Sequence, residues 1–297
     1  LSHKDKLSQK VAVYVVGALA VIDLVAINLN YVNKDNFVPK IQVNQPFQPT
    51  EADLLVAQKE GDFRVFDQQG AFNSARASYF HQALGGYHAA KPKKVQELMD
   101  YQIANQNLEI LNMYNVKYVL TTDEAGQVIP LENPSANGNA WFVKDIKIVS
   151  SADEAMESLS TLKSKETAVV QENFAKKLKN SYTLDSIASV QLIQNKPNHL
   201  IYKSSNTNDG LVVFSENYYP KGWNVLLDGR SVEMIEVNYT LRGLAVPSGF
   251  HTIEFKFEPE VVKKGSLISL VSTILGLLFI IGCFFIASKK CKTKKEL

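Results

Sequence analysis

The residues best suited to bind a charged or sugar-bearing ligand lie in one short stretch around the pair Gly85-Gly86. Within sixteen positions the stretch holds cationic, aromatic and imidazole side chains: Arg76, Tyr79, His81, Tyr87, His88 and Lys91. Cations donate hydrogen bonds to phosphate, aromatic faces suit pyranose rings, and glycine lets a ligand approach the backbone. The functional hypothesis is a loop that helps hold a lipid phosphate or an acceptor. The alternative is a buried connector whose histidines and arginine only attach it to the domain.

A second cluster, Glu216, Tyr218, Tyr219 and Trp223, could also bind a sugar. In the functional interpretation, Tyr218, Tyr219 and Trp223 stack on sugar rings. In the alternative, these aromatic residues pack in the core of a strand-turn-strand unit, and the usual burial of aromatic side chains favours that alternative.

The familiar patterns of enzyme active sites are missing from the sequence. It has no Gly-rich phosphate loop, no GxSxG and no HExxH. His81 and His88 have no third metal ligand nearby, so a zinc site is not predicted. The only cysteines are Cys283 and Cys291, close to the C-terminus. We therefore expect no catalytic residue, no metal and no cofactor in this chain.

Two apolar segments predict membrane spans. Leu267–Ala287 is an uncharged run of 21 residues, and Val11–Leu29 is an apolar run of 19 residues. About 20 such residues cross a bilayer as a helix. Lysines precede the first run and follow the second, which predicts that both termini are cytoplasmic and residues about 31–265 extracytoplasmic. The predicted segments are a basic cytoplasmic segment 1–10, a span 11–30, a span 266–288 and a basic cytoplasmic tail 289–297.

Asp23 lies inside the first predicted span. A carboxyl group at membrane depth is costly, so it normally faces a protein partner or water. One hypothesis is a polar contact with further transmembrane helices of a longer protein. The other is that Asp23 lies near enough to the outer interface to be hydrated.

The segment between the spans predicts an α+β fold. We expect an extended connector over 31–60, an α/β domain over 61–186 and a small β-sandwich over 187–260. Alternating and apolar runs predict strands at Gly61–Asp67, Val116–Leu120, Trp141–Val149, Ala168–Val170 (an edge strand), Ser189–Gln194, Leu200–Tyr202, Leu211–Glu216, Asn224–Leu227, Val232–Val237, Gly243–Val246 and Thr252–Phe257. We expect an ordered loop over 72–91, a helix from Pro92 and a helix that opens with a capping box at Ser151 and continues through Leu162. The net charge is only +2, and the middle of the chain is near neutral, which argues against nucleic acid as a partner.

Several motifs resemble the YfhO family of bacterial membrane proteins. In the C-terminal part these are Ser215-Glu216-Asn217-Tyr218-Tyr219-Pro220, Gly222-Trp223, Asp228-Gly229, Pro247-Ser248-Gly249, Glu254-Phe255 and Glu258-Pro259. Upstream they are Phe63-Arg64-Val65, Phe72-Asn73, Arg76, Ser78-Tyr79-Phe80-His81, Gly85-Gly86-Tyr87-His88 and Asn115-Val116-Lys117-Tyr118, in the family's order. The resemblance extends over roughly the whole chain.

The resemblance implies an envelope glycosyltransferase similar in plan to GT-C enzymes. Such enzymes transfer a sugar from a polyprenyl phosphate to an envelope polymer, at the outer face of the bacterial cytoplasmic membrane. Their catalytic carboxylate lies in a many-helix N-terminal region that this sequence lacks, so no catalytic residue is carried over. We expect the chain to be a C-terminal part that binds and positions, in contact with the bilayer, the lipid-linked sugar and the polymer. The alternative is a stand-alone two-span envelope protein whose external domain binds a glycan or a protein.

Overall fold

The computed structural model describes residues 8–176, 178–184 and 187–293, and the chain forms two compact units, Leu1–Pro49 and Thr50–Leu297. In the first unit, helix α1 (Gln9–Tyr31) begins after Ser8, whose Oγ accepts a hydrogen bond from the backbone N–H of Val11. The apolar run that predicted a span at 11–30 therefore forms one continuous helix.

The connector predicted over 31–60 is not extended throughout, because it contains three short helices. They are η2 (Lys34–Asn36), α2 (Lys40–Asn44) and α3 (Glu51–Ala57). Helix α3 belongs to the second unit and begins with a reciprocal capping box. The Oγ1 of Thr50 accepts from the N–H of Asp53, and the Asp53 carboxylate accepts from the N–H of Thr50. This Thr-x-x-Asp signal marks a helix start that the proline content obscured.

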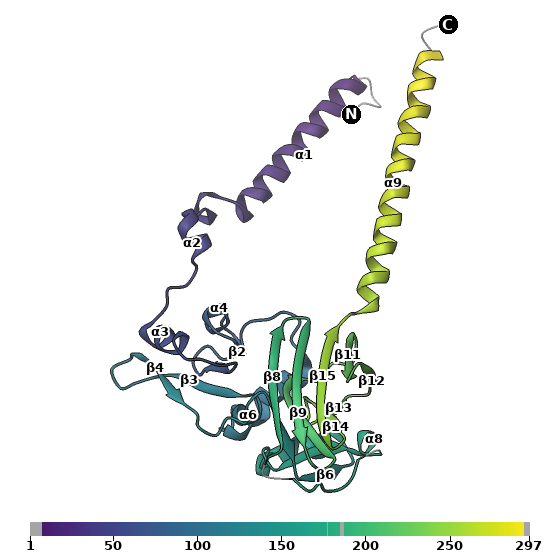
Figure 1. Ribbon diagram of the computed structural model, residues 1–297. Coiled ribbons are helices and arrows are strands. Elements are labelled where there is room, and N and C mark those ends of the chain that lie inside the picture. Colours follow the sequence, from purple (N-terminus) through teal and green to yellow (C-terminus); the bar gives the residue numbers. More distant parts are fainter. Residues whose placement is uncertain (1–7, 177, 185–186, 294–297) are drawn as a thin grey trace. The chain divides into compact units, whose positions relative to one another are not determined.

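The second unit is built on three β-sheets over its described residues (Figure 1). The first sheet has the order β2–β1–β3–β4, with strands at Ala83–Leu84, Arg64–Asp67, Val116–Thr122 and Val128–Glu132. The second has the order β5–β10–β14–β13–β7–β6, with strands at Ala140–Val143, Gly210–Asn217, Leu241–Val246, Ile235–Val237, Thr167–Gln171 and Asp145–Val149. The third has the order β12–β11–β15–β9–β8, with strands at Arg230–Val232, Trp223–Leu227, Gly249–Phe257, His199–Asn206 and Ser189–Lys196.

Helices fill the connections between the strands. The segments are α4 (Arg76–Phe80), α5 (Lys93–Leu98), the π-helix η3 (Met99–Ile103), α6 (Leu108–Met113), α7 (Ala152–Ser158), the 3-10 turn η4 (Leu159–Thr161), α8 (Glu172–Ala175) and the long C-terminal α9 (Glu260–Thr293). The helix predicted from Pro92 thus ends in a π turn, and α6 is a second helix. The segment 72–91 contains α4 and β2 and is not a plain loop.

The six-stranded sheet is strongly curled. Only Lys144 lies between β5 and β6, although these strands are the two edges of the sheet order. Six flat strands place their outer pair about 24 Å apart at about 4.8 Å per step, whereas one residue spans at most about 3.6 Å. The sheet therefore bends until its edges meet at Lys144. The run predicted as one strand, Trp141–Val149, is accordingly split, because its first half pairs with β10 and its second half with β7.

Both faces of this curled sheet are packed. On β10, Val212 and Phe214 face the five-stranded sheet, and the Phe214 ring lies 4.9 Å from the ring centroid of Phe255. The alternate residues Leu211 and Val213 belong to the largest core, which also takes side chains from α5, α6 and α7. The five-stranded sheet, the curled sheet and the helices therefore form successive layers.

Strands from both sides of the predicted division at residues 186 and 187 share the curled sheet. Three of them precede the division and three follow it, so 61–186 and 187–260 are joined by hydrogen bonds as well as by a common core. The run Val232–Val237 is also divided, with β12 in one sheet and β13 in the other. Ala168–Val170 was predicted as an edge strand, but β7 lies between β13 and β6.

The capping signal at Ser151 is confirmed in its first half. The Oγ of Ser151 accepts from the N–H of Glu154 at 3.1 Å. The Glu154 carboxylate, however, accepts from the N–H and the hydroxyl of Ser150, one residue before the cap. The turn signal Asp228-Gly229 is confirmed as the two-residue connection between β11 and β12, and both residues have positive φ.

The edges of the three sheets are irregular or short. The edge strand β8 pairs with β9 through a register shift between Leu192 and Gln194.

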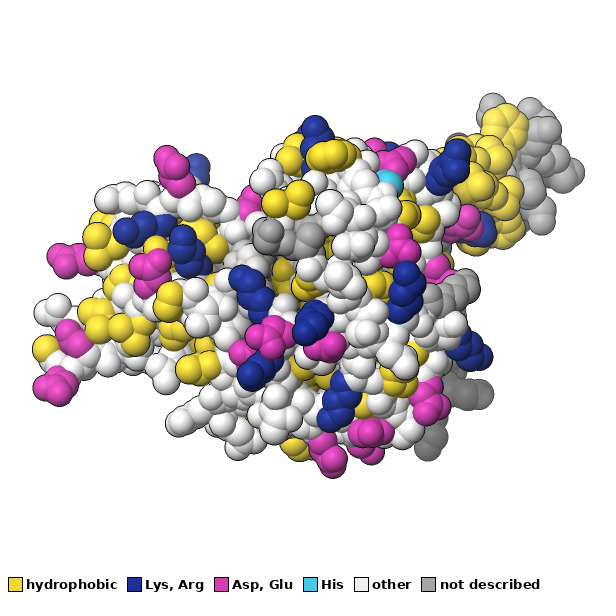
Figure 2. All heavy atoms as spheres, turned by 60° about the horizontal axis from the view of Figure 1, so that its bottom comes forward, with side chains coloured by type: hydrophobic (Ala, Val, Ile, Leu, Met, Phe, Trp, Pro, Cys, Tyr) yellow, Lys and Arg dark blue, Asp and Glu magenta, His cyan; other side chains and the backbone are white. Residues whose placement is uncertain are grey.

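On the face shown in Figure 2, acidic and basic side chains are interspersed among the described residues, so that face has no continuous area of one charge sign.

The C-terminal span leaves the five-stranded sheet after two residues. Strand β15 ends at Phe257, and the N–H of Glu258 donates to the carbonyl of Gly222 at 2.7 Å. Helix α9 then begins at Glu260 and contains the predicted span 266–288. Within the residues that the structure describes, two helices are long and apolar enough to cross a membrane, one over Lys10–Asn36 and one over Glu260–Phe285.

We expect Gly210→Ala to destabilise the domain by about 1–3 kcal/mol, the usual effect of overpacking a core. A Cβ at Gly210 would lie 2.6 Å from a ring atom of Phe142, which packs between the two sheets. Urea unfolding of the full chain in detergent, followed by tryptophan fluorescence, measures the effect. The double variant Gly210→Ala/Phe142→Leu should be less destabilised than the sum of the single variants. Additive losses would show that the two sites do not collide.

Candidate functional site

Two of the predicted loop residues converge on one buried carboxylate. Asp53 of α3 is 2% exposed, and its carboxylate forms an ion pair with the guanidinium of Arg76. The Nε2 of His81 lies 3.0 Å from Asp53 Oδ1, and the His81 side chain is also buried. Both residues therefore attach helix α4 and the residue that follows it, together called the α4 segment (76–81), to α3.

The electrostatics of this contact favour an ionised Asp53. Burial raises the pKa of Asp53, but hydrogen bonds from Arg76, Thr50 and His81 outweigh it and hold the pKa at about 2. A guanidinium that already binds a carboxylate in this way has fewer free donors for a phosphate. This arrangement matches the alternative in which Arg76 and His81 are attachment residues.

The other four residues of the predicted cluster do not join this contact. Tyr79 and Tyr87 are 48% and 72% exposed, and His88 is exposed as well. The ammonium of Lys91 donates to Gln96 at 2.8 Å and lies over the ring of Phe72. The structure therefore does not bring all six predicted residues together around one binding position.

Tyr218 and Trp223 pack against neighbouring side chains. The ring of Tyr218 meets Phe174 edge-on, with centroids 5.6 Å apart. The guanidinium of Arg242 lies 4.2 Å from the ring centroid of Trp223 and 5.1 Å from that of Phe255. Arg242 is 3% exposed, its Nη1 has no hydrogen-bond partner among the described residues, and burial lowers its pKa. One face of Trp223 is therefore occupied by a cation of the same chain.

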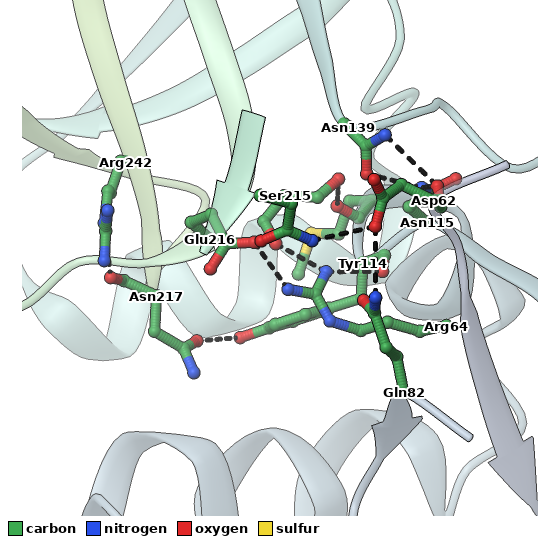
Figure 3. A network of polar contacts seen from close by, with 12 residues as sticks. Asp62, Arg64, Gln82, Tyr114, Asn115, Asn139, Ser215, Glu216, Asn217 and Arg242 are labelled. Atoms are coloured by element: carbon green, nitrogen blue, oxygen red, sulfur yellow. Dashed lines mark hydrogen bonds and ion pairs between the residues drawn. The ribbon is translucent and has the colours of Figure 1, made fainter. Parts of the chain in front are cut away.

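A polar network joins the first sheet to the curled sheet (Figure 3). The guanidinium of Arg64 on β1 donates to the carbonyls of Tyr114 and Ser215 at 3.0 and 2.6 Å. It also forms an ion pair with Glu216 at 2.7 Å. The Ser215 hydroxyl donates in turn to the carbonyl oxygen of Gly138, 2.7 Å away. Arg64 thus connects β1 with β10.

The network continues on both sides of Arg64. The Tyr114 hydroxyl donates to Asn217 Oδ1 at 2.7 Å, and burial raises the pKa of Tyr114 to about 12. On the other side, the amide of Asn115 donates to the carbonyl of Asp62 and to Asn139, both at 2.9 Å. The Asp62 carboxylate accepts from Gln82 at 3.0 Å. Figure 3 shows these side chains as one connected group.

An open cleft of about 470 Å³ lies beside this network. Its lining combines one aromatic ring, three carboxylates, two amides and one ammonium: Phe63, Glu60, Asp62, Glu132, Asn115, Asn133 and Lys117. The Lys117 ammonium lies 5.7 Å from the centroid of the Phe63 ring. The cleft has the volume of a ligand site, with hydrogen-bonding groups of both kinds around an aromatic ring.

A second, more apolar cleft of about 780 Å³ shares the segment 132–134 with the first. The π-helix η3 and α6 form one wall, and β3 and β4 form the other, with Leu108 and Leu131 exposed at its sides. The two clefts together follow the connection from β4 towards β5.

Sequence reasoning did not propose the lining of the first cleft as a site, although the upstream family motifs contain Phe63, Asn115 and Lys117. Asn115 has φ of +55°, a conformation that asparagine tolerates better than most residues. The contribution of Glu132 depends on strand β4, which the sequence pattern did not predict.

Asp23 lies within α1 and is exposed in the first unit.

Comparisons with known proteins found one family match. Residues 155–269 match the family model described as "Bacterial membrane protein YfhO". The match runs from α7 through β15 into α9, and the upstream motifs from Phe63 to Tyr118 lie outside it. No curated protein and no solved structure matches the chain.

We expect Asp53→Asn to lower stability at pH 7 by about 2 kcal/mol, the free energy equivalent of a pKa depressed from 3.8 to about 2. The ionised carboxylate contributes this stability above about pH 4 and loses it as the pH falls towards 2. The parent protein should lose stability over that window, whereas the Asn variant should lack this part of the pH dependence. Urea unfolding of the full chain in detergent at several pH values measures both.

The matched control is Asp153→Asn in the exposed first turn of α7. It should change stability by no more than about 0.5 kcal/mol, as surface substitutions usually do. An Asp53→Asn variant with the parent's pH dependence would show that the Arg76 and His81 contacts do not depend on the charge of Asp53.

Proposed function

The YfhO-family match over residues 155–269 supports a bacterial membrane protein of that family, and on this premise we propose that the chain is the membrane-anchored, extracytoplasmic part of a glycosyltransferase-like protein. In this proposal the full protein transfers a sugar from a polyprenyl phosphate to a cell-envelope polymer. The part described here binds and positions the glycan and does not break bonds. The observation that carries the proposal is the cleft beside Phe63.

The chemistry of the cleft suits an uncharged sugar better than a phosphate. The carboxylates of Glu60, Asp62 and Glu132 accept hydrogen bonds from hydroxyl groups, and the Lys117 ammonium donates to them. The apolar face of a pyranose ring suits the ring of Phe63. Three carboxylates around one ammonium repel an anionic group. Phosphate recognition is therefore assigned to another part of the full protein.

The contacts of the α4 segment favour the same assignment. Arg76 is the strongest phosphate donor of the predicted loop, and it is paired with buried Asp53. The loop residues Tyr79, His88 and Lys91 remain candidates for acceptor contacts, whereas the buried His81 is retained with Arg76 as an attachment residue. Tyr218 and Trp223 are retained as packing residues, since Trp223 already stacks on Arg242.

We place the protein in the cytoplasmic membrane, with both termini cytoplasmic and residues about 31–265 outside. Two apolar helices and the family match support membrane localisation. The lysines before Val11 and after Ala287 support the orientation by the positive-inside rule. In this orientation Asp23 of α1 is available to further transmembrane helices of the full protein.

The second candidate function is a stand-alone two-span envelope protein that binds a glycan or a protein. One observation favours keeping it, because Thr50–Leu297 forms a compact unit with its own cores. The cleft serves glycan binding in both candidates. They differ in whether transferase chemistry belongs to the same polypeptide, which the size of the native gene product on a membrane blot decides.

We expect Glu132→Gln to weaken glycan binding about tenfold or more, because a hydrogen bond to a charged group contributes about 1.5–3 kcal/mol. The side chain is exposed at the rim of the cleft, so the change should leave the fold intact. Binding of the full chain in nanodiscs to purified envelope polysaccharide of the source bacterium, measured by surface plasmon resonance, tests it. Phe63→Leu should weaken binding in the same assay through loss of the ring face.

The control for charge is Glu124→Gln in the exposed turn between β3 and β4, outside the cleft. It removes the same charge and should leave affinity unchanged. Equal losses in the two Glu variants, or no loss in Glu132→Gln, would refute the assignment of the cleft.

A further inference from the structure

One face of the second unit exposes apolar side chains that its own core does not use. Helix α3 directs Ala52 and Val56 into a core under the first sheet, whereas Leu54 and Leu55 remain 52% and 51% exposed. The chain that follows α4 and β2 adds Tyr87 at 72% exposure. We call Leu54, Leu55 and Tyr87 the α3–α4 face.

Contacts within the unit hold these residues on neighbouring segments. The Asp53 carboxylate binds Arg76 and lies 3.0 Å from His81, which joins α3 to α4. Gly86 lies against α4, because a Cβ built on it would meet the Ser78 hydroxyl at 3.2 Å. Tyr87 follows Gly86 directly in the sequence.

The α3–α4 face lies at the end of the domain from which α9 leaves. The end of β15 pairs with the start of β9, where Lys256 is opposite His199. On the other side of β9, Lys196 at the end of β8 is also opposite His199. From that end of β8, Asn195 donates to Asp62 at 2.8 Å, and Asp62 also accepts from Gln82, two residues after α4. Figure 1 shows α3 and α4 at this end of β8, β9 and β15.

The length of α9 before its apolar run fixes how near this end is to the bilayer. Residues 260–265 separate Pro259 from the predicted span, and six helical residues rise about 9 Å. The headgroup layer on each side of the hydrocarbon core is about 5–8 Å deep. The end of the five-stranded sheet therefore lies at, or just above, the headgroups.

We propose that the α3–α4 face is a lipid-contact surface that rests on the outer headgroup layer of the membrane that anchors the chain. Tyrosine side chains are favoured at this depth, because the ring is apolar and the hydroxyl stays hydrated. Leu54 and Leu55 bury their side chains at the boundary of the acyl chains. The contact gives the domain a lateral point of attachment in addition to its spans. The inference depends on membrane anchoring and is independent of glycan binding.

The charges near the face indicate that the contact is apolar rather than ionic. Glu51 and Glu60 flank α3 together with Lys59, so these three groups carry a small net negative charge and no excess of cations. Arg76 is paired with Asp53. Binding should therefore depend little on anionic lipid, unlike a polybasic surface.

Site-directed spin labelling of the full chain in nanodiscs tests the surface. Single cysteines replace Leu55 or Tyr87 in a Cys283→Ser/Cys291→Ser background, and each carries a nitroxide. The control is Phe250→Cys, because Phe250 is 86% exposed and lies at the opposite end of β15, seven residues and about 23 Å from Phe257. Collisions with oxygen report lipid, and collisions with a water-soluble nickel chelate report solvent.

We expect labels at positions 55 and 87 to collide several-fold more with oxygen, relative to the chelate, than the label at position 250. The ratio should be the same in phosphatidylcholine nanodiscs and in nanodiscs that also contain phosphatidylglycerol. Chelate access at 55 and 87 equal to that at 250 would overturn the proposal. Low access to both relaxants would also overturn it, because a protein would then cover the face. If a label disturbs folding, quenching of Tyr87→Trp by brominated lipids, with Phe250→Trp as control, decides the same question.

Discussion

A single residue constrains the architecture of the second unit, Thr50–Leu297. Because only Lys144 separates β5 from β6, the six-stranded sheet must curl until its edge strands meet. The curl gives the sheet an inner face for the largest core and an outer face for the five-stranded sheet. Phe214 and Phe255 close the contact between the sheets, and Arg64 fastens the first sheet to the same strand, β10. Each layer therefore takes its position from the curled sheet.

Buried and half-buried charges in this domain are mostly used to join segments that are far apart in the sequence. Asp53 binds both Arg76 and His81, and Arg64 forms an ion pair with Glu216, which is 152 positions away in the sequence. Arg242 differs in part, because its Nε donates to the carbonyl of Asn217 at 2.8 Å, whereas its Nη1 is unpaired among the described residues and two aromatic rings lie beside the guanidinium. Residues that the sequence predicts to bind a ligand can therefore instead connect two segments of the fold, as Arg76 and His81 do by binding Asp53.

The sequence predicted the parts of the fold that depend on local chemistry. The two apolar runs become α1 and α9, Ser151 caps α7, and Asp228-Gly229 makes the β11–β12 turn. What it could not supply was pairing between distant strands, because alternation defines a strand but not its neighbour. The break at Lys144 and the interior place of β7 both depend on such pairing. The first cleft was missed for the same reason, since β4 and the corner at Asn115 meet there only after the sheet has formed.

The register shift in β8 affects how readily neighbouring molecules in the same membrane could pair through their sheet edges. An exposed strand edge invites a neighbouring molecule to add a strand, and anchored domains are held in the same plane at the same height. In the four outer strands of the first and third sheets, this risk is reduced in different ways. Strands β2 and β12 are only two and three residues long, β4 carries Pro130, and β8 is interrupted between Leu192 and Gln194. The domain can therefore be concentrated in a membrane without edge-to-edge sheet growth between neighbouring copies.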